Sequence, residues 1–563
     1  MSTTTPTGDA VNGAGPVMPD EATLTRLANE FFGALNSPES RSVPAPGGPT
    51  PPSAPPQPPA QLPRYEPPGQ LSDYHRAAAV PGRLAALVAQ QSPFAAPGLP
   101  PATAGAMRPG ANPGSWEPAF ERRDGGQPGA PSFYFIDDGA AVPGRPAVVA
   151  VDDHTAFQVD AVRRDFPVLQ ERVHGRQLVW LDNAATTQKP QVVIDRLVYF
   201  YQHENSNIHR AAHALAARAT DAFEGARATV ARFLGAPSAD DIVFTRGTTE
   251  AINLVAQAWG RQRIGPGDEI VVSHLEHHAN IVPWQQLAEV TGAKIRVIPV
   301  DDDGQLLLDA YTNLLNDRTR LVSVAHVSNV LGTVVPVKAV IEAAHRAGAR
   351  VLIDGAQAVA HIPVDVQALD ADFYVFSGHK IFGPTGIGAL YAKAEILEEM
   401  PPWQGGGNMI SDVTFERTIY QGPPARFEAG TGNIADAVGL GTALDYLQGL
   451  GLPLVERYEH QLLEYALGEI RTVPGLRLIG TAPEKASVLS FVLEGYRPEE
   501  VGSALDKEGI AVRAGHHCAQ PILRRFGLES AVRPSLAMYN THGEVDLLVA
   551  ALRRLAADAG RRR

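Results

Sequence analysis

Short apolar runs alternate with longer amphipathic stretches from about residue 155 to the C-terminus. Each of five such runs has four to six residues, is rich in Val, Ile or Phe, and predicts a buried strand. A polar or glycine-containing turn follows each run, and helical sequence usually comes next. This alternation is typical of a largely parallel α/β sheet. The five predicted strands are Ile242–Thr245, Ile270–Ser273, Leu321–His326, Val351–Asp354 and Phe373–Ser377.

The first 150 residues do not follow this pattern. Pro and Gly make up 45 of them, or 30%, whereas the following 413 residues contain only 19 prolines. A segment of this composition cannot bury enough apolar surface to offset the entropy that is lost on ordering it. We therefore expect residues 1–150 to be a largely disordered leader.

Three short stretches within the leader are richer in apolar side chains, at about residues 20–36, 71–92 and 128–138. One interpretation is that they dock onto the folded part of the same chain. The other is that they are short linear motifs that become ordered on a different protein, as helix-in-groove and strand-addition peptides do. A long tether with spaced apolar motifs suits a docking tail better than a folded domain.

Charge and composition exclude several classes of protein. The net charge is −13 and no basic tract stands out, so we expect neither nucleic acid nor an anionic membrane as a partner. No apolar run is long enough for a transmembrane helix, and the first residues do not resemble a secretory signal. Cys518 is the only cysteine, so no intramolecular disulfide can form, and we expect a cytoplasmic protein.

Polar side chains follow the predicted strands at the points where they end. Ligands of parallel α/β sheets bind at the carboxyl ends of the strands, so these side chains are candidates for a binding site. The candidates are Thr248, Thr249, His277, Asn329, Asp354, Gln357, Ser377, His379 and Lys380.

Two of these candidates, Lys380 and Asp354, follow neighbouring predicted strands. The chain has only seven lysines against 41 arginines, and Lys380 stands alone among them at a strand end. A solvated lysine or a plain ion pair is the simplest interpretation. However, pyridoxal phosphate enzymes need this pair, a lysine for the Schiff base and an acid that keeps the pyridine nitrogen protonated. The pair therefore predicts pyridoxal 5'-phosphate as the cofactor.

The segment FTRGTTEAINLVA reads as a strand, a glycine turn and a helix. Its turn amides and threonine hydroxyl groups form a candidate phosphate site, which Ser377 and His379 can also reach. In EHHANIVPW, one imidazole of His277 and His278 can stack on a cofactor ring. We expect no metal site, because no third and fourth ligand accompany this histidine pair at a metal-binding spacing.

Cys518 lies in the segment AVRAGHHCAQP, close to Arg513 and two histidines. A lone cysteine is often only a small buried hydrophobic residue, but neighbouring cations favour the nucleophilic thiolate. Further along, Arg533 begins the segment RPSLAMYNTH, where its guanidinium group can hold a carboxylate through two hydrogen bonds.

Together these segments resemble the SufS-type (group II) cysteine desulfurases of the class-V aminotransferase family. The motifs that carry the resemblance include LDNAATTQKP, NIHRAAHALAARAT, DGAQAVAHIPVDVQALDADFYVFSGHKIFGPTGIG, RFEAGTGN and RAGHHCA. The resemblance implies a homodimer with the α/β fold of fold-type I, aspartate aminotransferase-like enzymes. Residues 155–440 would form a pyridoxal phosphate-binding large domain with a mainly parallel, seven-stranded sheet. Residues 441–563 would form a small α+β C-terminal domain that carries the nucleophilic cysteine.

The resemblance also implies a role for each matching residue. The catalytic residues that it implies are Lys380, Cys518 and His277. The cofactor-binding residues that it implies are Thr248, Thr249, His277, Asn329, Asp354, Gln357, Ser377, His379, Lys380 and Thr431, of which Thr431 would reach across the dimer. The substrate-binding residues that it implies are Arg533, Arg513, Asn329 and Arg210.

The activity implied is the conversion of L-cysteine to L-alanine, with the sulfur taken up by Cys518 as a persulfide and then passed to an acceptor protein. The leader makes the chain similar to the extended desulfurases packaged in encapsulin shells. This similarity implies a sulfur-storage or sulfur-mobilising cargo enzyme within a protein nanocompartment. The alternatives are a housekeeping SufS-like desulfurase for Fe–S cluster assembly, a selenocysteine lyase or cysteine-sulfinate desulfinase, or a structural protein with an inactive enzyme domain.

Overall fold

The computed structural model describes residues 157–209 and 212–562. The chain divides into two units, Met1–Gln127 and Pro128–Arg563, and all of the described residues belong to the second unit. The expected leader, with its three apolar stretches, lies outside the described residues.

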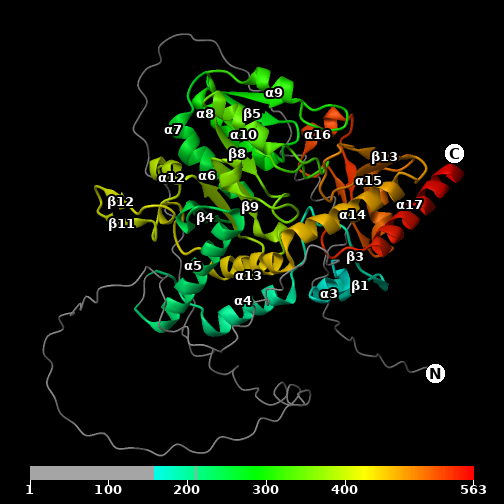
Figure 1. Ribbon diagram of the computed structural model, residues 1–563, viewed down its shortest axis with the longest axis horizontal. Coiled ribbons are helices and arrows are strands. Elements are labelled where there is room, and N and C mark those ends of the chain that lie inside the picture. The colour runs from blue at the N-terminus through cyan, green and yellow to red at the C-terminus, as the bar shows by residue number, and fades with distance from the viewer. Residues whose placement is uncertain (1–156, 210–211, 563) are drawn as a thin grey trace, which may run out of the picture. The chain divides into compact units, whose positions relative to one another are not determined.

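A seven-stranded sheet forms the centre of the described fold (Figure 1). Six of its strands run parallel to one another, and β10 runs antiparallel to both of its neighbours. This sheet confirms the predicted mainly parallel, seven-stranded α/β architecture. In spatial order, its strands are β4 (Ile242–Thr245), β10 (Gly388–Ala392), β9 (Phe373–Ser377), β8 (Arg350–Asp354), β7 (Thr319–Ala325), β5 (Glu269–Ser273) and β6 (Lys294–Ile298).

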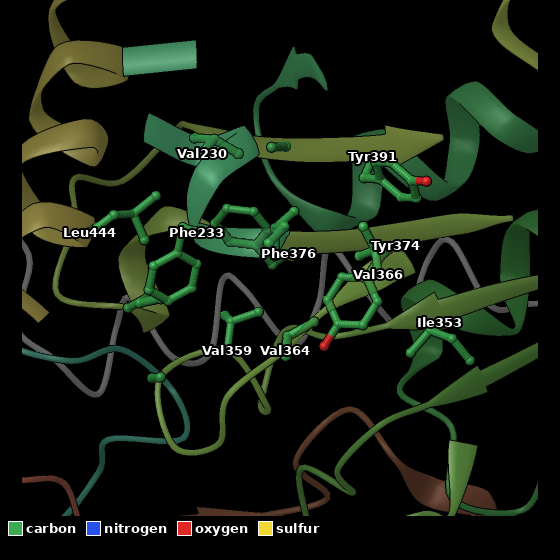
Figure 2. Close-up of a cluster of buried hydrophobic side chains, with 14 of the residues drawn as sticks. Val230, Phe233, Ile353, Val359, Val364, Val366, Tyr374, Phe376, Tyr391 and Leu444 are labelled. Carbon is green, nitrogen blue, oxygen red and sulfur yellow. The ribbon is translucent and has the colours of Figure 1, made fainter. Parts of the chain in front are cut away.

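Both faces of this sheet are buried, as the continuous apolar runs of its strands predict. On β9, Tyr374 and Phe376 belong to one hydrophobic core cluster, whereas Phe373 and Val375 belong to another on the opposite face. Figure 2 shows the first of these clusters, in which side chains of β8, β9 and β10 lie near labelled residues of α5 and α13, among them Phe233 and Leu444. The sheet is therefore the middle layer of a three-layer sandwich.

Helices cover each face of the sheet. On the first face, α13 packs against both α4 and α5 (Figure 1). The helices that contribute to the core of this face include α3 (Val159–Arg164), α4 (Gln191–His203), α5 (Ala214–Leu234), α9 (Leu308–Leu314), α10 (Val337–Arg346) and α13 (Ile434–Leu450). Those on the second face are α6 (Thr248–Leu254), the π-helical turn η3 (Val255–Gly260), α8 (Val282–Thr291) and α12 (Ala394–Glu399).

A second, antiparallel sheet lies in the C-terminal part of the chain, and helices α14, α15 and α17 share a core with it. The predicted domain boundary between residues 440 and 441 stays a prediction, and α13 runs unbroken across it. The strands of this sheet, in spatial order, are β13 (Leu476–Ile479), β14 (Ser490–Leu493), β17 (Ala531–Arg533) and β16 (Arg513–Gly515). The helices of this part are α14 (Leu452–Ile470), α15 (Pro498–Asp506), α16 (Gln520–Arg525) and α17 (His542–Arg562).

Short elements connect these layers. The parallel pair of β3 and β15 links the beginning of the described chain to its C-terminal part. None of the helices in the described ranges is long and apolar enough to cross a membrane. The short strands are β1 (Arg172–Val173), β2 (Arg176–Gln177), β3 (Val179–Trp180), β11 (Ile410–Val413), β12 (Thr418–Tyr420) and β15 (Ile510–Ala511). The short helical turns are η1 (Pro167–Gln170), η2 (Ala239–Asp241), α7 (Arg261–Arg263), η4 (His278–Asn280), α11 (Val366–Leu369), η5 (Gly378–Lys380) and η6 (Ala425–Phe427).

Candidate active site

A cavity of about 200 Å³ lies at the carboxyl ends of the parallel strands β4, β5, β7, β8 and β9. Its lining comes from segments that are up to about 350 residues apart in the chain. The lining residues are Ala184, Ala185, Thr248, Thr249, His277, Ala279, Ala325, Val327, Asn329, Asp354, Ala356, Gln357, Ser377, His379, Lys380, Arg513, His517, Cys518 and Arg533.

Most of the site residues predicted from the sequence line this one cavity. Thr431 does not line it: this residue is exposed and lines two other cavities. Its expected reach into a partner subunit therefore stays a prediction. Arg210 lies outside the described residues. The geometry brings the other predicted residues together, and their individual roles remain predictions.

Lys380 and Asp354 both line the cavity. Burial lowers the pKa of Lys380 to about 8, although the charge of Asp354 acts in the opposite direction. Asp354 is 5% exposed, and its Oδ1 accepts a hydrogen bond of 3.0 Å from the backbone N–H of Ala356. Burial raises the pKa of Asp354, while the Ala356 amide and Lys380 favour its charged form. The pair thus offers an amine that is readily deprotonated beside a carboxylate.

Tyr374 and His326, which the sequence analysis missed, lie beside Asp354, whose backbone carbonyl accepts a hydrogen bond of 2.9 Å from the His326 N–H. The hydroxyl group of Tyr374 and Nδ1 of His326 are 3.0 Å apart, and both side chains are buried. A Cβ atom on Gly355 would lie 2.1 Å from the Tyr374 ring, so only glycine allows this close approach. In the sequence, Gly355 directly after Asp354 was the feature that could have indicated this packing.

Backbone and hydroxyl groups line the end of the cavity beside β4. The backbone N–H of Thr248 donates to Ser377 Oγ at 2.9 Å, and the two hydroxyl oxygens are also 2.9 Å apart. Gly247 has φ +147°, and a Cβ atom there would lie 3.0 Å from Ser377 Oγ. This glycine turn leaves room for an anion beside several hydroxyl groups, as the sequence predicts for the cofactor phosphate.

His277 is a neutral imidazole in this site. Burial and the nearby charge of Lys380 lower its pKa to about 3. Its Nδ1 accepts a hydrogen bond of 3.0 Å from the backbone N–H of Ala279, so the ring proton is on Nε2. Gln357 is also held in place, because its Nε2 donates to the carbonyl of Ala184 at 2.6 Å.

Cys518 lies in a loop with an unusual backbone. His517 and Cys518 both have positive φ angles, 52° and 54°, which is uncommon for non-glycine residues. The Cys518 N–H donates to Nδ1 of His516 at 3.0 Å, and the N–H of His278 donates to the Cys518 carbonyl at 2.8 Å. The second bond holds the loop against η4, the helical turn that follows β5, and Cys518 lines the cavity and is partly exposed.

Arg533 reaches the cavity from β17 and is 2% exposed. Its Nη1 donates to the Asn329 carbonyl at 2.9 Å, and its Nη2 donates to Oδ1 of Asp182 at 3.2 Å. The other carboxylate oxygen of Asp182, Oδ2, accepts a hydrogen bond from Nε of Arg513. The sequence analysis gave Asp182 no role, although the motif LDNAATTQKP contains it.

The residues of this cavity fit pyridoxal 5'-phosphate. Asn329 Oδ1 and Arg533 Nε are buried polar atoms without a hydrogen-bond partner in the described part of the chain. Lys380 can bond to an aldehyde, Asp354 can pair with a pyridinium nitrogen, and the Thr248 and Ser377 side chains can donate to a phosphate. A lysine and a carboxylate at neighbouring strand ends of this sheet define the class of fold-type I pyridoxal phosphate enzymes.

Comparisons with known proteins agree with this class. The family model described as aminotransferase class-V matches residues 179–548. The chain belongs to the class-V aminotransferase family, whose cofactor is pyridoxal 5'-phosphate, and the relatives described next are cysteine desulfurases.

The relatives differ in how much of their length this chain matches. The cysteine desulfurase of Synechococcus elongatus is 68% identical over 399 residues, which are 71% of this chain and 64% of that relative. The probable cysteine desulfurase of Mycolicibacterium paratuberculosis is 68% identical over 403 residues, 72% of this chain and 59% of that relative. The chain thus spans less than two thirds of the length of either protein. The cysteine desulfurase of Dickeya dadantii is 54% identical over 400 residues, which are 71% of this chain and 97% of that relative.

Solved structures show the same fold. The cysteine desulfurase CsdA of Escherichia coli has a TM-score of 0.67 at 42% identity, covering 72% of this chain and 99% of that chain. The apo cysteine desulfurase of Thermococcus onnurineus has a TM-score of 0.68 at 36% identity, covering 71% of this chain and 98% of that chain.

Proposed function

We propose that this protein is a cysteine desulfurase that converts L-cysteine to L-alanine and takes up the sulfur on Cys518. One observation carries the proposal: a single cavity contains Lys380, Asp354, Arg533 and Cys518. An aminotransferase of the same family needs the lysine and the aspartate but has no use for a thiol at this place. The high identity to cysteine desulfurases supports the same activity.

The bound cofactor supplies an electron sink for the bonds around the substrate Cα. Asp354 keeps the pyridine nitrogen protonated, which this function requires. The Lys380 amine, with its pKa of about 8, removes the α-proton and later returns a proton. His277 lines the same cavity and would stack on the cofactor ring with its Nε2 proton available for donation, and Arg533 would bind the substrate carboxylate.

The sulfur transfer itself uses Cys518. Its thiolate forms an S–S bond to the substrate sulfur while the substrate C–S bond breaks. The electron pair of the broken bond stays on the substrate carbon, which takes up a proton and becomes the methyl group of L-alanine. The protein keeps the sulfur as a Cys518 persulfide, and an acceptor molecule then removes it.

Two variants test this proposal. Cys518→Ala should keep the visible absorption of the bound cofactor but lose alanine formation from L-cysteine. Lys380→Ala should lose alanine formation as well, whereas the exposed lysine variant Lys294→Ala should keep it. Full turnover of L-cysteine by Cys518→Ala would contradict the proposed sulfur acceptor.

We further propose that the protein is a SufS-type homodimer and that residues 1–150 direct it to an encapsulin-type shell. Two observations support a docking leader. One is its composition, and the other is that the described residues of the cavity all lie between 184 and 533, so none of them belongs to the leader. Two relatives also extend well beyond the region that they share with this chain. This arrangement would place sulfur storage or mobilisation within a nanocompartment.

Co-expression with a candidate shell protein, followed by size-exclusion chromatography, tests the leader. Deletion of residues 1–150 should leave alanine formation unchanged and abolish co-elution with the shell. Co-assembly of the deletion variant at the wild-type level would refute the docking role. Size-exclusion chromatography without the shell measures the expected dimer.

A further inference from the structure

Asp182 lies between two arginines of the cavity and divides its carboxylate between them. Its Oδ1 accepts a hydrogen bond of 3.2 Å from Nη2 of Arg533, and its Oδ2 accepts one of 3.2 Å from Nε of Arg513. Asp182 is 9% exposed and Arg533 is 2% exposed, so water screens this contact little. Each guanidinium group thus donates to a different oxygen of the Asp182 carboxylate.

The main chain fixes the place of Asp182 from two sides. Directly before it, β3 pairs with β15, and the Leu181 N–H donates to the Ala511 carbonyl at 2.9 Å. Asp182 itself forms a β-bridge with Ser535, two residues after Arg533. Arg513 lies two residues after Ala511 and Arg533 lies two residues before Ser535, so these pairings place the backbone of both arginines close to Asp182.

Arg533 has a second fixed contact and one free donor. Its Nη1 donates to the Asn329 carbonyl at 2.9 Å, which together with Asp182 sets the plane of the guanidinium group. Its Nε is buried and has no hydrogen-bond partner within the described ranges. A planar cation that lines the cavity, is anchored at two nitrogens and has an unpaired third nitrogen is suited to a carboxylate ligand.

The charges in this cluster need a balancing anion. Burial lowers the pKa of Arg533 to about 10, the charge of Arg513 acts in the same direction, and Asp182 opposes both. Without the Asp182 carboxylate, the two guanidinium groups would repel each other, and the half-exposed Arg513 would be free to turn towards water.

We propose that Asp182 is a positioning residue, which holds Arg533 in the orientation that binds the α-carboxylate of the amino-acid substrate. This inference rests on the proposed function, because Arg533 binds the substrate there. Asp182 itself does not touch the substrate. It acts by fixing the guanidinium plane and by offsetting the repulsion between Arg513 and Arg533.

The test compares Asp182→Asn and Asp182→Glu with the wild-type holoenzyme. Asp182→Asn keeps the volume of the side chain but replaces one acceptor oxygen with a donor that faces an arginine. We expect the KM for L-cysteine to rise about 10- to 100-fold, while kcat changes less than about threefold. Calorimetry should show the same loss of affinity for the product L-alanine. Asp182→Glu, which keeps the charge, should recover a large part of both affinities.

A matched control and a double variant separate this role from general damage. Asp302→Asn removes another aspartate–arginine pair, the exposed contact of 2.8 Å to Arg525, and should leave KM unchanged. Arg533→Lys should raise KM by itself, and adding Asp182→Asn should raise it little further, because Asp182 acts through Arg533. Fully additive effects on KM, or an unchanged KM in Asp182→Asn, would overturn the proposal.

The outcomes also distinguish this inference from the proposed function. A wild-type protein that formed no alanine from L-cysteine would contradict the desulfurase activity. Weaker L-alanine binding by Asp182→Asn would then still support the positioning role, and equal binding would overturn it. If Asp182→Asn did not fold, as judged by thermal melting, the same comparison would be made with Asp182→Glu and with Arg513→Gln.

Discussion

The side-chain amide of Asn329 donates a hydrogen bond of 2.7 Å to the carbonyl oxygen of His517, which lies 188 residues further along the chain. Asn329 follows β7 of the large sheet, whereas His517 precedes Cys518 in the loop after β16. The bond therefore ties the residue expected to contact cofactor and substrate to the loop that carries the proposed nucleophile. If Asn329 contacts the substrate as expected, this hydrogen bond would couple substrate binding to the placement of the thiol.

Asn329→Ala should loosen the Cys518 loop. The loop has two consecutive positive φ angles, so it depends on such bonds to keep a conformation that is unfavourable for non-glycine residues. We expect faster amide hydrogen exchange at residues 515–519 and a fall in alanine formation of about 10- to 100-fold. The control is Asn316→Ala, a substitution at an exposed residue. If residues 515–519 exchanged at the same rate in Asn329→Ala and in this control, the coupling would be contradicted.

Gly388→Ala should disturb the phosphate end of the cavity. A Cβ atom at Gly388 would lie 2.4 Å from the Phe376 carbonyl oxygen and 2.6 Å from Cα of Gly247. Both are backbone atoms, so no side-chain movement can relieve the overlap. We expect a loss of stability of about 1–3 kcal/mol and weaker retention of pyridoxal phosphate, measured by thermal melting and by cofactor absorbance after dialysis.

The control for this variant is Gly225→Ala. Gly225 is exposed within α5, and a Cβ atom there would meet no other atom within 4 Å. Alanine is the better helix former, so this change should stabilise the protein by about 0.5–1 kcal/mol. Similar melting temperatures for the two variants would show that the close approach at Gly388 has no consequence.

Glu276 should make the stability of the protein depend on pH. Burial raises its pKa from 4.5 to about 7, although the Asn280 side chain donates to it at 2.6 Å and the Ser273 hydroxyl also donates to it. Because the folded pKa is raised, the stabilising contribution is present below about pH 4.5 and is lost as the pH rises through 7. The full effect of this shift is at most about 3 kcal/mol.

Chemical denaturation of wild type and Glu276→Gln at pH 5 and pH 8 measures this effect. The stability of the variant relative to wild type should be higher at pH 8 than at pH 5. The exposed substitution Glu289→Gln is the control and should change the relative stability equally at both pH values. If Glu276→Gln also changed the stability equally at pH 5 and pH 8, the proposed titration of Glu276 would be ruled out.

The buried pair of Arg227 and Glu428 should contribute strongly to stability. Nη1 of Arg227 donates to Oε1 of Glu428 at 2.6 Å, and Nη2 donates to Oε2 at 2.9 Å. Glu428→Gln leaves a buried arginine against an amide, and we expect a loss of about 3–5 kcal/mol in thermal or chemical unfolding. Asp445→Asn, which breaks the exposed pair with Arg232, should cost less than about 1 kcal/mol. Equal losses for the two substitutions would contradict the argument from burial.

The sequence predicted the large sheet well because buried parallel strands are continuous apolar runs. The predicted strands Ile242–Thr245 and Phe373–Ser377 coincide with β4 and β9, and the other three differ from the observed strands by one or two residues at an end. The strand ends also indicated which side chains would meet, since parallel strands present their carboxyl ends at one edge. The strands β6 and β10 were not among the five predicted, and the antiparallel direction of β10 could not be predicted, because an apolar run contains no information about strand direction.

The sequence by itself determined the chemical groups of the cavity: the amine of Lys380, the carboxylate of Asp354, the imidazole of His277 and the single thiol. Only the tertiary structure decided how these groups are held. Asp182 reaches two arginines more than 330 residues away through pairings with β15 and Ser535, and no local periodicity encodes such partners. Strand and helix patterns arise from neighbours in the chain, whereas the orientation of a buried side chain depends on whichever distant backbone comes to lie against it.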